Sequence, residues 1–414
     1  MPSPTTPSPA RGLAAAEAYA RRIESDLVGN ILPFWLKHAI DPKRECFHGS
    51  VGPDLKPDPS ALRGALLTSR ILWTYSAAYR RYRTSEYLRM ADFAYLDLLS
   101  HFHDSRHGGF FWSLRPDGTV LQDRKQTYGQ AFAIYALSEY HAASGRPEPL
   151  EIAIEVHHLL ERHARDPVLG GYLEALGRDW KPITDMRLSA GDMNVPKSQN
   201  TLLHVMEAYA CLLRVWPDAD LERSQIDLLR VMVDHVLQGD TGHLGLFFSN
   251  DWKPQSDQIS YGHDIEAAWL LTEAANGVNH APLRERICSI AVRIAEVTLA
   301  EGIDTDGAVM NQGGPQGLTN TGKDWWPQAE AVTGFLNAYE IGRHPRHLEA
   351  AFRSWDFIET RLIDRTHGEW IRSVDRAGRP AGDMAKISFW KCPYHNGRTG
   401  LEAVARLRRL ASTT

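Results

Sequence analysis

Apolar and polar residues alternate along nearly the whole chain with the spacing of amphipathic helices, in long segments of two types. Segments of the first type carry more charge and a one-sided apolar stripe, as in residues 150–156, which predicts helices with one face against a core. Segments of the second type, as in residues 131–137, are richer in small and apolar residues, which predicts helices buried on most sides. The first-type segments span residues 14–39, 84–103, 148–164, 221–238, 282–301 and 346–363.

Turn regions in which glycine precedes aromatic or apolar residues follow the first-type segments. The regions that align readily begin at Gly108, Gly170, Gly245, Gly307 and Gly368. Polar residues and further Gly or Trp residues come next, and this composition suits a short β-hairpin. The second-type segments then begin near residues 61, 128, 200, 262, 327 and 395, at intervals of 62 to 72 residues. A period this constant predicts a repeated pair of helices.

The repeat predicts an all-α fold, an (α/α)6 barrel in which the second-type helices form the inner ring. The short β-hairpins would then crowd the rim where the inner helices begin. Because one helix pair could not bury its apolar face alone, residues 13–414 are expected to form a single catalytic domain. Residues 1–12 are rich in Pro, Ser and Thr and are expected to form a flexible tail. Helix N-termini carry free amides and positive dipole ends, so that rim favours an anionic intermediate.

Residues suited to acid–base chemistry lie at the starts of the second-type helices. Asn200 and His204 are four residues apart, and His263 and Glu266 are three apart. Either spacing places both members of a pair on the same face of a helix. The alternative interpretations are a core histidine for His204 and an exposed ion pair for His263 and Glu266.

Other helix starts carry aromatic and charged residues. Tyr128 begins one inner helix, and Trp325 and Trp326 begin another, where their indoles either fill the core or form a platform. Arg70 interrupts the apolar segment 66–73. A permanent cation there needs an internal salt bridge, a ligand or a path to solvent.

Residues 390–398, Trp-Lys-Cys-Pro-Tyr-His-Asn-Gly-Arg, combine the indole of Trp390, the imidazole of His395 and the guanidinium of Arg398. A sugar offers an apolar ring face and a rim of hydroxyls, so aromatic surface beside charged groups suits it. The imidazole adds proton chemistry near neutral pH. A partly buried loop with a structural histidine is the alternative.

Composition narrows the class of protein. The 414 residues include 46 basic and 51 acidic side chains, a net charge of −5, without the basic block that nucleic-acid binding needs. The four cysteines are far apart and form no Cys-x-x-Cys, which fits a reducing cytoplasm rather than a disulfide framework or a thiolate zinc site. No apolar run approaches the ~18 residues that span a bilayer, and the N-terminus lacks signal-peptide features.

The stretches 200–204, 260–266, 325–330 and 390–398 resemble those of the cellobiose 2-epimerases, members of the N-acylglucosamine 2-epimerase superfamily, in order over nearly the whole chain. The resemblance implies an (α/α)6 barrel that interconverts glucose and mannose at the reducing end of β-1,4-linked disaccharides, without a metal or redox cofactor. After ring opening, a base removes the carbon-2 proton to leave a cis-enediolate, which is reprotonated from the opposite face. The sugar is the expected partner, with neither nucleic acid nor membrane, and the chain is expected to be a monomer or a weak homodimer.

The resemblance also implies roles for the matching residues. His263 and His395 would be the two acid/base groups, Glu266 would orient and charge His263, and His204 would assist ring opening. The residues that would bind the sugar are Arg70 and Asn200 at the reacting oxygens, Tyr128 in the first subsite, and Trp326 and Trp390 as stacking platforms, Trp390 for the second sugar.

Other functions stay open. Relatives epimerise free mannose or glucose, or isomerise an aldose to a ketose with the same residues. A six-hairpin glycoside hydrolase would need two carboxylates about 5 to 9.5 Å apart, and Glu266 has no obvious carboxylate partner in the sequence. A zinc or iron site could use His204, His263, Glu266 and His395. A non-catalytic sugar-binding protein would leave so many titratable groups unexplained.

Overall fold

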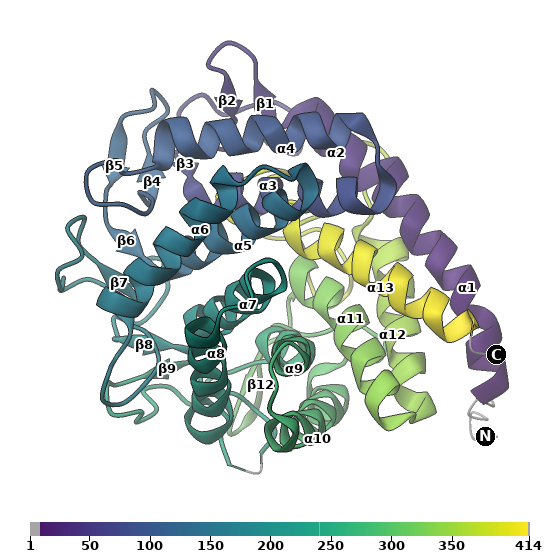
Figure 1. Cartoon of the computed structure of the whole chain (residues 1–414). Helices are drawn as coiled ribbons and strands as arrows, with labels where there is room; N and C mark the ends of the chain where they lie inside the picture. The colour runs from purple at the N-terminus through teal and green to yellow at the C-terminus, as the bar shows by residue number, and fades with distance from the viewer. Residues whose placement is uncertain (1–8, 240, 413–414) are drawn as a thin grey trace.

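The computed structural model describes residues 9–239 and 241–412, and its inner helices form a closed ring (Figure 1). Each inner helix packs against the next, and the last packs against the first. This closure confirms the predicted (α/α)6 barrel. The inner helices are α3 (Ala65–Tyr82), α5 (Thr127–Ser144), α7 (Gln199–Val215), α9 (Tyr261–Asn276), α11 (Trp325–Gly342) and α13 (Tyr394–Ser412).

An outer layer of helices covers the ring and corresponds to the first-type segments. The outer helices α1, α4, α6, α8, α10 and α12 pack on inner helices. Because α1 packs along α13, the start of α1 and the end of α13 lie close together in Figure 1. The outer helices are α1 (Pro9–Asp26), α2 (Leu32–His38), α4 (Ser85–Asp97), α6 (Glu148–Leu159), α8 (Ala219–Val231), α10 (Ala281–Val297) and α12 (Pro345–Phe357).

A π-helical turn interrupts the first of the first-type segments and ends each of the other five, which the periodicity did not predict. The first and last residues of every turn are buried, so the widened turn keeps both positions in the core beside the helix end. The turns are Leu27–Ile31, Leu98–Phe102, Leu160–Ala164, Met232–Val236, Thr298–Gly302 and Ile358–Leu362.

The short strands at the rim mostly pair between successive repeats rather than as local hairpins. A strand of two residues is too short to stand as an isolated hairpin, so it pairs across the repeat boundary and ties neighbouring inner helices together. The antiparallel pairs are β3 (Arg63–Gly64) with β4 (Ser113–Leu114), β6 (Lys125–Gln126) with β7 (Ala175–Leu176), β8 (Lys197–Ser198) with β9 (Phe247–Phe248), β10 (Ile259–Ser260) with β11 (Gln312–Gly314), and β13 (Lys323–Asp324) with β14 (Ser373–Val374).

Some short strands also pair as hairpins within one repeat. They are β1 (Ile40–Asp41) with β2 (Cys46–Phe47), β4 with β5 (Val120–Gln122), and β11 with β12 (Gly317–Asn320). Single antiparallel bridges close further hairpins at Leu176–Pro182, Phe248–Pro254 and Val374–Pro380. The predicted hairpins are therefore present at the rim beside the cross-repeat pairs.

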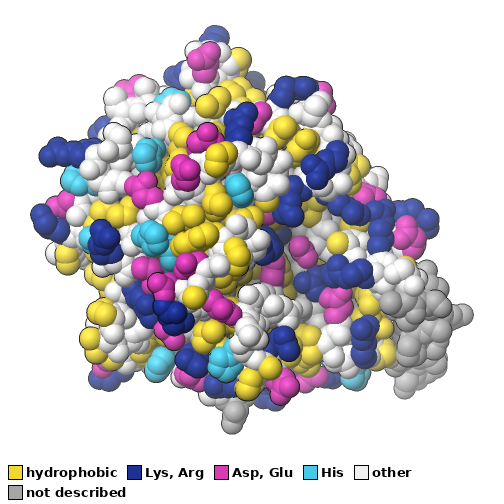
Figure 2. Space-filling model, in the orientation of Figure 1, with side chains coloured by type: hydrophobic (Ala, Val, Ile, Leu, Met, Phe, Trp, Pro, Cys, Tyr) yellow, Lys and Arg dark blue, Asp and Glu magenta, His cyan; other side chains and the backbone are white. Residues whose placement is uncertain are grey.

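The predicted N-terminal tail, residues 1–12, lies mostly outside the described residues. Residues 1–8 are not described, and α1 begins at Pro9. No helix in the described ranges is long and apolar enough to cross a membrane. Basic and acidic side chains are interspersed over the face shown in Figure 2.

Candidate active site at the inner-helix starts

One pocket of about 250 Å³ lies where the inner helices begin, and it brings together side chains from separate repeats. The predicted site residues that line it are Arg70, Tyr128, Asn200, His204, His263, Glu266, Trp326, Trp390 and His395. All the predicted site residues thus share one pocket. Ring closure explains this, since it turns six equivalent helix starts toward a common axis.

His263 is positioned by the cap of its own helix. The Ser260 hydroxyl accepts from the His263 backbone N–H at the start of α9, and the same Oγ is hydrogen-bonded to the His263 ring Nδ1 at 2.7 Å. Nε2 is the other nitrogen of the ring, whose centroid is 4.7 Å from that of Trp326. Burial lowers the pKa of His263, so the ring is neutral near pH 7 and able to accept a proton.

The predicted pairing of Glu266 with His263 was wrong. Among the described residues, no hydrogen bond or ion pair joins them, and Glu266 is 1% exposed, which also excludes an exposed ion pair. Glu266 instead accepts from Arg398 at 2.7 Å and lies 3.8 Å from His395 Nδ1. The two side chains line the same pocket, but the capping serine competes for the ring nitrogen.

His395, which is 5% exposed, has a carboxylate partner that the sequence did not reveal. Its Nδ1 donates to Glu330 Oε1 at 2.7 Å, which fixes the ring and leaves Nε2 free. Its ring centroid lies 5.5 Å from that of Trp326. Burial, and then the nearby cations Arg70 and Arg398, lower the pKa of His395. Both predicted acid/base rings therefore rest against one indole and are neutral.

His204 makes a similar pair within α7. Its Nδ1 donates to Glu207 Oε2 at 2.8 Å, and its ring lies edge-on to Tyr128, with centroids 5.0 Å apart. Burial lowers the pKa of His204. It is buried like a core histidine yet lines the pocket, and Glu207 follows it at the same three-residue spacing that drew attention to Glu266.

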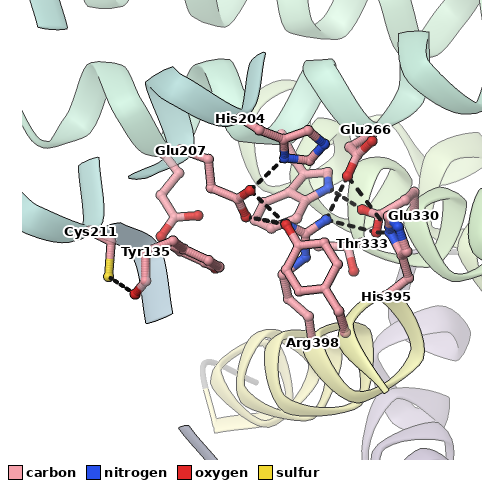
Figure 3. A network of polar contacts seen from close by, with 12 residues as sticks. Tyr135, His204, Glu207, Cys211, Glu266, Glu330, Thr333, His395 and Arg398 are labelled. Atoms are coloured by element: carbon pink, nitrogen blue, oxygen red, sulfur yellow. Dashed lines mark hydrogen bonds and ion pairs between the residues drawn. The ribbon is translucent and has the colours of Figure 1, made fainter. Parts of the chain in front are cut away.

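Arg398 joins the carboxylates behind these histidines into one network (Figure 3). Its Nη2 donates to Glu266 at 2.7 Å and to Glu330 at 2.8 Å, and its Nη1 donates to Glu207. Tyr394 Oη donates to the same Glu207 carboxylate at 2.6 Å. The sequence showed this arginine only as part of a motif, because its partners lie on three other helices.

The network assigns charges to its members. Burial opposes ionisation of Glu207, but Arg398 outweighs it and lowers the pKa of Glu207 to about 2. Burial raises the pKa of Glu266, and the neighbouring charge of Glu330 raises it further. Burial likewise raises the pKa of Glu330. Burial and mutual repulsion therefore both oppose full ionisation of this pair, since two close carboxylates do not both ionise readily.

The same cluster is relevant to two alternatives considered from the sequence, a glycoside hydrolase and a zinc or iron site. Glu266, Glu330 and His395 place ligand atoms within 4.8 Å of one another, whereas His204 and His263 lie outside this group. Glu266 thus does have a carboxylate neighbour, contrary to the expectation from the sequence. Because one Arg398 nitrogen bonds both carboxylates, a cation already lies between them, and they are not free to flank a glycosidic bond.

Arg70 differs from Arg398 in having no acidic partner. It is 2% exposed, donates to Tyr128 Oη at 2.7 Å, and lies over the rings of Phe132 and Tyr394 at 4.3 and 4.7 Å. No carboxylate forms an ion pair with it among the described residues, so the internal salt bridge considered from the sequence is not present. Its charge remains available to an anionic ligand in the pocket.

Glu174 is a buried carboxyl that sequence reasoning missed. It accepts from Ser198 Oγ at 2.7 Å and from Thr201 Oγ1 at 2.9 Å, at the start of α7. Burial raises the pKa of Glu174 to about 7, against the opposing effect of these hydrogen bonds. Between the ordinary glutamate pKa and this value, the folded protein keeps a proton that the unfolded chain has lost. The protonated Glu174 side chain therefore stabilises the folded state fully at low pH, and this stabilisation declines as the pH rises toward 7.

Glu174→Gln is expected to remove this pH dependence, since an amide does not titrate. Relative to the wild type, the free energy of unfolding of the variant should rise by about 3 kcal/mol between roughly pH 4 and pH 8. Urea unfolding of both proteins across this range measures the difference. Parallel pH profiles would contradict a raised pKa at Glu174.

The similarity of this chain to known proteins extends over nearly the whole barrel. Residues 47–395 match the N-acylglucosamine 2-epimerase (GlcNAc 2-epimerase) family. A cellobiose 2-epimerase from Bacteroides fragilis is 42% identical over 390 residues, 93% of this chain and 98% of that protein. The structure of cellobiose 2-epimerase from Spirochaeta thermophila is similar with a TM-score of 0.90 at 40% identity, covering 98% of this chain and 99% of that one. A D-mannose isomerase from Marinomonas mediterranea is 24% identical over 387 residues, 88% of this chain and 92% of that protein.

Proposed function

This chain belongs to the N-acylglucosamine 2-epimerase family, and from that premise we propose that it interconverts glucose and mannose at the reducing end of β-1,4-linked disaccharides such as cellobiose. The observation that carries the proposal is the pair of imidazoles, His263 and His395, against the indole of Trp326. Epimerisation needs one group to take a proton and another to return one. Imidazoles do both near neutral pH.

The reaction begins with ring opening, in which His204 moves a proton between the sugar hydroxyl and the ring oxygen. The carbon-2 proton of the open aldose is acidic because a carbonyl is adjacent. One imidazole removes it through Nε2, the electrons pass to the aldehyde oxygen, and a cis-enediolate forms. The other imidazole takes up a proton from solvent once the enediolate has formed and donates a proton to the opposite face of carbon 2, which inverts that centre.

Arg70 and Asn200 stabilise the enediolate. The unpaired guanidinium of Arg70 supplies positive charge in a buried site, where it acts more strongly than in water. Asn200 Oδ1 has no hydrogen-bond partner among the described residues and accepts from a substrate hydroxyl. The negative charge of the enediolate favours the protonated form of each nearby imidazole, so a ring that is neutral in the free protein can act as the acid.

Incubation of the protein with cellobiose, mannobiose, glucose and mannose in heavy water tests this function. Formation of the disaccharide epimers with deuterium at carbon 2 supports it, and the reaction is expected to continue in the presence of a chelator. Ketose products labelled at carbon 1 would favour the isomerase alternative instead. Conversion of free mannose without conversion of disaccharides would favour a monosaccharide enzyme.

Trp390 is expected to matter for disaccharide substrates and much less for monosaccharides. Its half-buried indole lines the pocket 6.2 Å from the ring of Tyr128, and we assign it to the second sugar. Trp390→Ala is expected to lower kcat/KM for cellobiose by a factor that corresponds to about 1–3 kcal/mol of lost transition-state stabilisation. Turnover of mannose should change much less. Steady-state kinetics on both sugars measure this, with mannose as the internal control. Equal losses would place Trp390 at the reacting ring.

A further inference from the structure

A second cavity, of about 340 Å³, adjoins the substrate pocket at Trp390. Leu188, Ser189 and Trp390 line both spaces, so the second cavity begins where the substrate pocket reaches this indole. Its volume falls within the range of small-ligand pockets, about 300–1,000 Å³. The proposed function places the second sugar of a disaccharide at Trp390. The second cavity is therefore positioned to receive a third group attached to that sugar.

Aromatic rings continue from Trp390 into the second cavity. The ring centroid of Phe389 lies 5.5 Å from that of Trp390, and the ring of Trp112 lies 5.0 Å from Phe389 and 6.2 Å from Trp390. Leu62 adds apolar surface to the lining and is 44% exposed, so the cavity is open to solvent. Hydroxyl and amide groups of the lining belong to Ser113, Gln122 and Ser189. Apolar surface beside such groups suits a sugar ring and its hydroxyls.

Arg124 gives the second cavity a positive charge that no acid neutralises. Its Nη1 donates to the Asp185 backbone carbonyl at 3.3 Å, and its Nη2 donates to that of Arg187 at 2.7 Å. Among the described residues, no carboxylate forms an ion pair with it. The other arginine of the lining, Arg187, donates to both carboxylate oxygens of Asp185 at 2.9 and 2.8 Å. The charged side chains of the lining therefore leave the charge of Arg124 without a counter-ion.

The half-buried guanidinium of Arg124 favours an anionic ligand. Burial lowers the pKa of Arg124, although the nearby charge of Asp185 opposes this effect. The side chain still stays charged near neutrality, and an anion beside it would offset the cost of burying that charge. The planar fork of an arginine matches the two oxygens of a carboxylate. One unpaired arginine suits one carboxylate better than a doubly charged phosphate.

We propose that the second cavity is a subsite for an acidic sugar, the third residue from the reducing end, and that Arg124 binds its carboxylate. The substrate class is then a β-1,4-linked oligosaccharide that carries a uronic acid beyond the disaccharide unit. This inference rests on the proposed function, because a disaccharide unit in the substrate pocket brings the third sugar to the cavity. Arg124 determines specificity and does not touch the reacting carbon.

Kinetics on two trisaccharides test the subsite. They are cellotriose and the same trisaccharide with carbon 6 of its non-reducing end oxidised to a carboxylate. At low ionic strength, kcat/KM of the wild type for the acidic trisaccharide should exceed that for cellotriose by about tenfold, since charge-assisted hydrogen bonds are stronger than neutral ones. Added salt should lower this ratio, because salt screens charges in a cavity that is open to solvent.

Three variants identify the groups responsible, and the ratio of kcat/KM between the two trisaccharides is compared in each. Arg124→Gln removes the charge and should bring the ratio to about one. Gln122→Glu keeps an oxygen that accepts from Ser113 Oγ, now at 2.9 Å, and adds a negative charge, so the acidic trisaccharide should become the poorer substrate. Arg115→Gln is the matched control. Arg115 also donates to a backbone carbonyl, that of Val120 at 3.0 Å, but does not line the cavity, so the ratio should stay as in the wild type.

Several outcomes would overturn the subsite and leave the proposed function intact. They are equal kcat/KM for the two trisaccharides in the wild type, a preference that Arg124→Gln retains, and turnover of cellobiose without turnover of either trisaccharide. Equal falls for cellobiose and both trisaccharides in Arg124→Gln would leave the ratio unchanged, and Arg124 would then only hold the loop at Asp185 and Arg187. Failure of the wild type to epimerise cellobiose would reject the proposed function, and the subsite with it.

Discussion

His263→Asn and His395→Asn are each expected to abolish epimerisation while the protein remains folded. Asparagine keeps a hydrogen-bonding amide but cannot carry a proton near neutrality, so the loss should reach at least the ~10²–10⁴ typical of general acid–base catalysis. The two rings both lie against the indole of Trp326, and the mechanism gives each a face of carbon 2. Turnover of cellobiose and a cooperative thermal transition measure activity and folding together.

Heavy water separates the tasks of the two imidazoles. A variant that retains the base for one face is expected to exchange deuterium into the starting sugar without forming its epimer. The wild type should place deuterium at carbon 2 of the product. A tenfold change in rate corresponds to only about 1.4 kcal/mol of activation free energy. A folded variant at either position that epimerises within about tenfold of the wild-type rate would therefore refute the role of that residue.

Arg398→Met is expected to lower the free energy of unfolding by about 3–5 kcal/mol, because it leaves buried carboxylates without their cation. The arginine contacts Glu207, Glu266 and Glu330, all of which are buried. Urea unfolding near neutral pH measures the loss. Since protonation relieves part of the repulsion among the carboxylates, the loss should be smaller at acidic pH.

Arg70→Met is the matched change at a buried arginine without an acidic partner. We expect it to lower kcat by about 10²–10³, as removal of an oxyanion-stabilising donor does, and to leave stability nearer to that of the wild type. Turnover of cellobiose and urea unfolding of the two variants make the comparison. A larger loss of stability in Arg70→Met than in Arg398→Met would contradict the difference in their partners.

The barrel was predictable because each helix pair leaves a recognisable pattern in its own stretch of sequence. Apolar spacing and the Gly-aromatic turns recur with each repeat, and a near-constant period implies a ring or a stack of equivalent units. The inner helices accordingly begin within a few residues of the expected positions. The π-helical turns were not predictable, since they depend on how each outer helix end packs on the core.

The members of the site were also predictable, but their partnerships were not. His263, His395 and Trp326 could be identified from position and chemistry at helix starts. The partner of His395 is 65 residues away, and Arg398 reaches a carboxylate 191 residues away. Contacts at such separation depend on the way the ring closes, and no local spacing reports them.

The sequence by itself determined the repeat, the helix faces and the chemical inventory of one rim, because these follow from spacing and residue type. Only the tertiary structure decided which carboxylate serves which histidine. Ser260 occupies the His263 ring nitrogen that Glu266 was expected to take, and Glu330 takes the corresponding place at His395. The physical reason is that a buried polar atom must form a hydrogen bond and takes the partner that lies within reach. Closure of the barrel decides which side chains come within that distance.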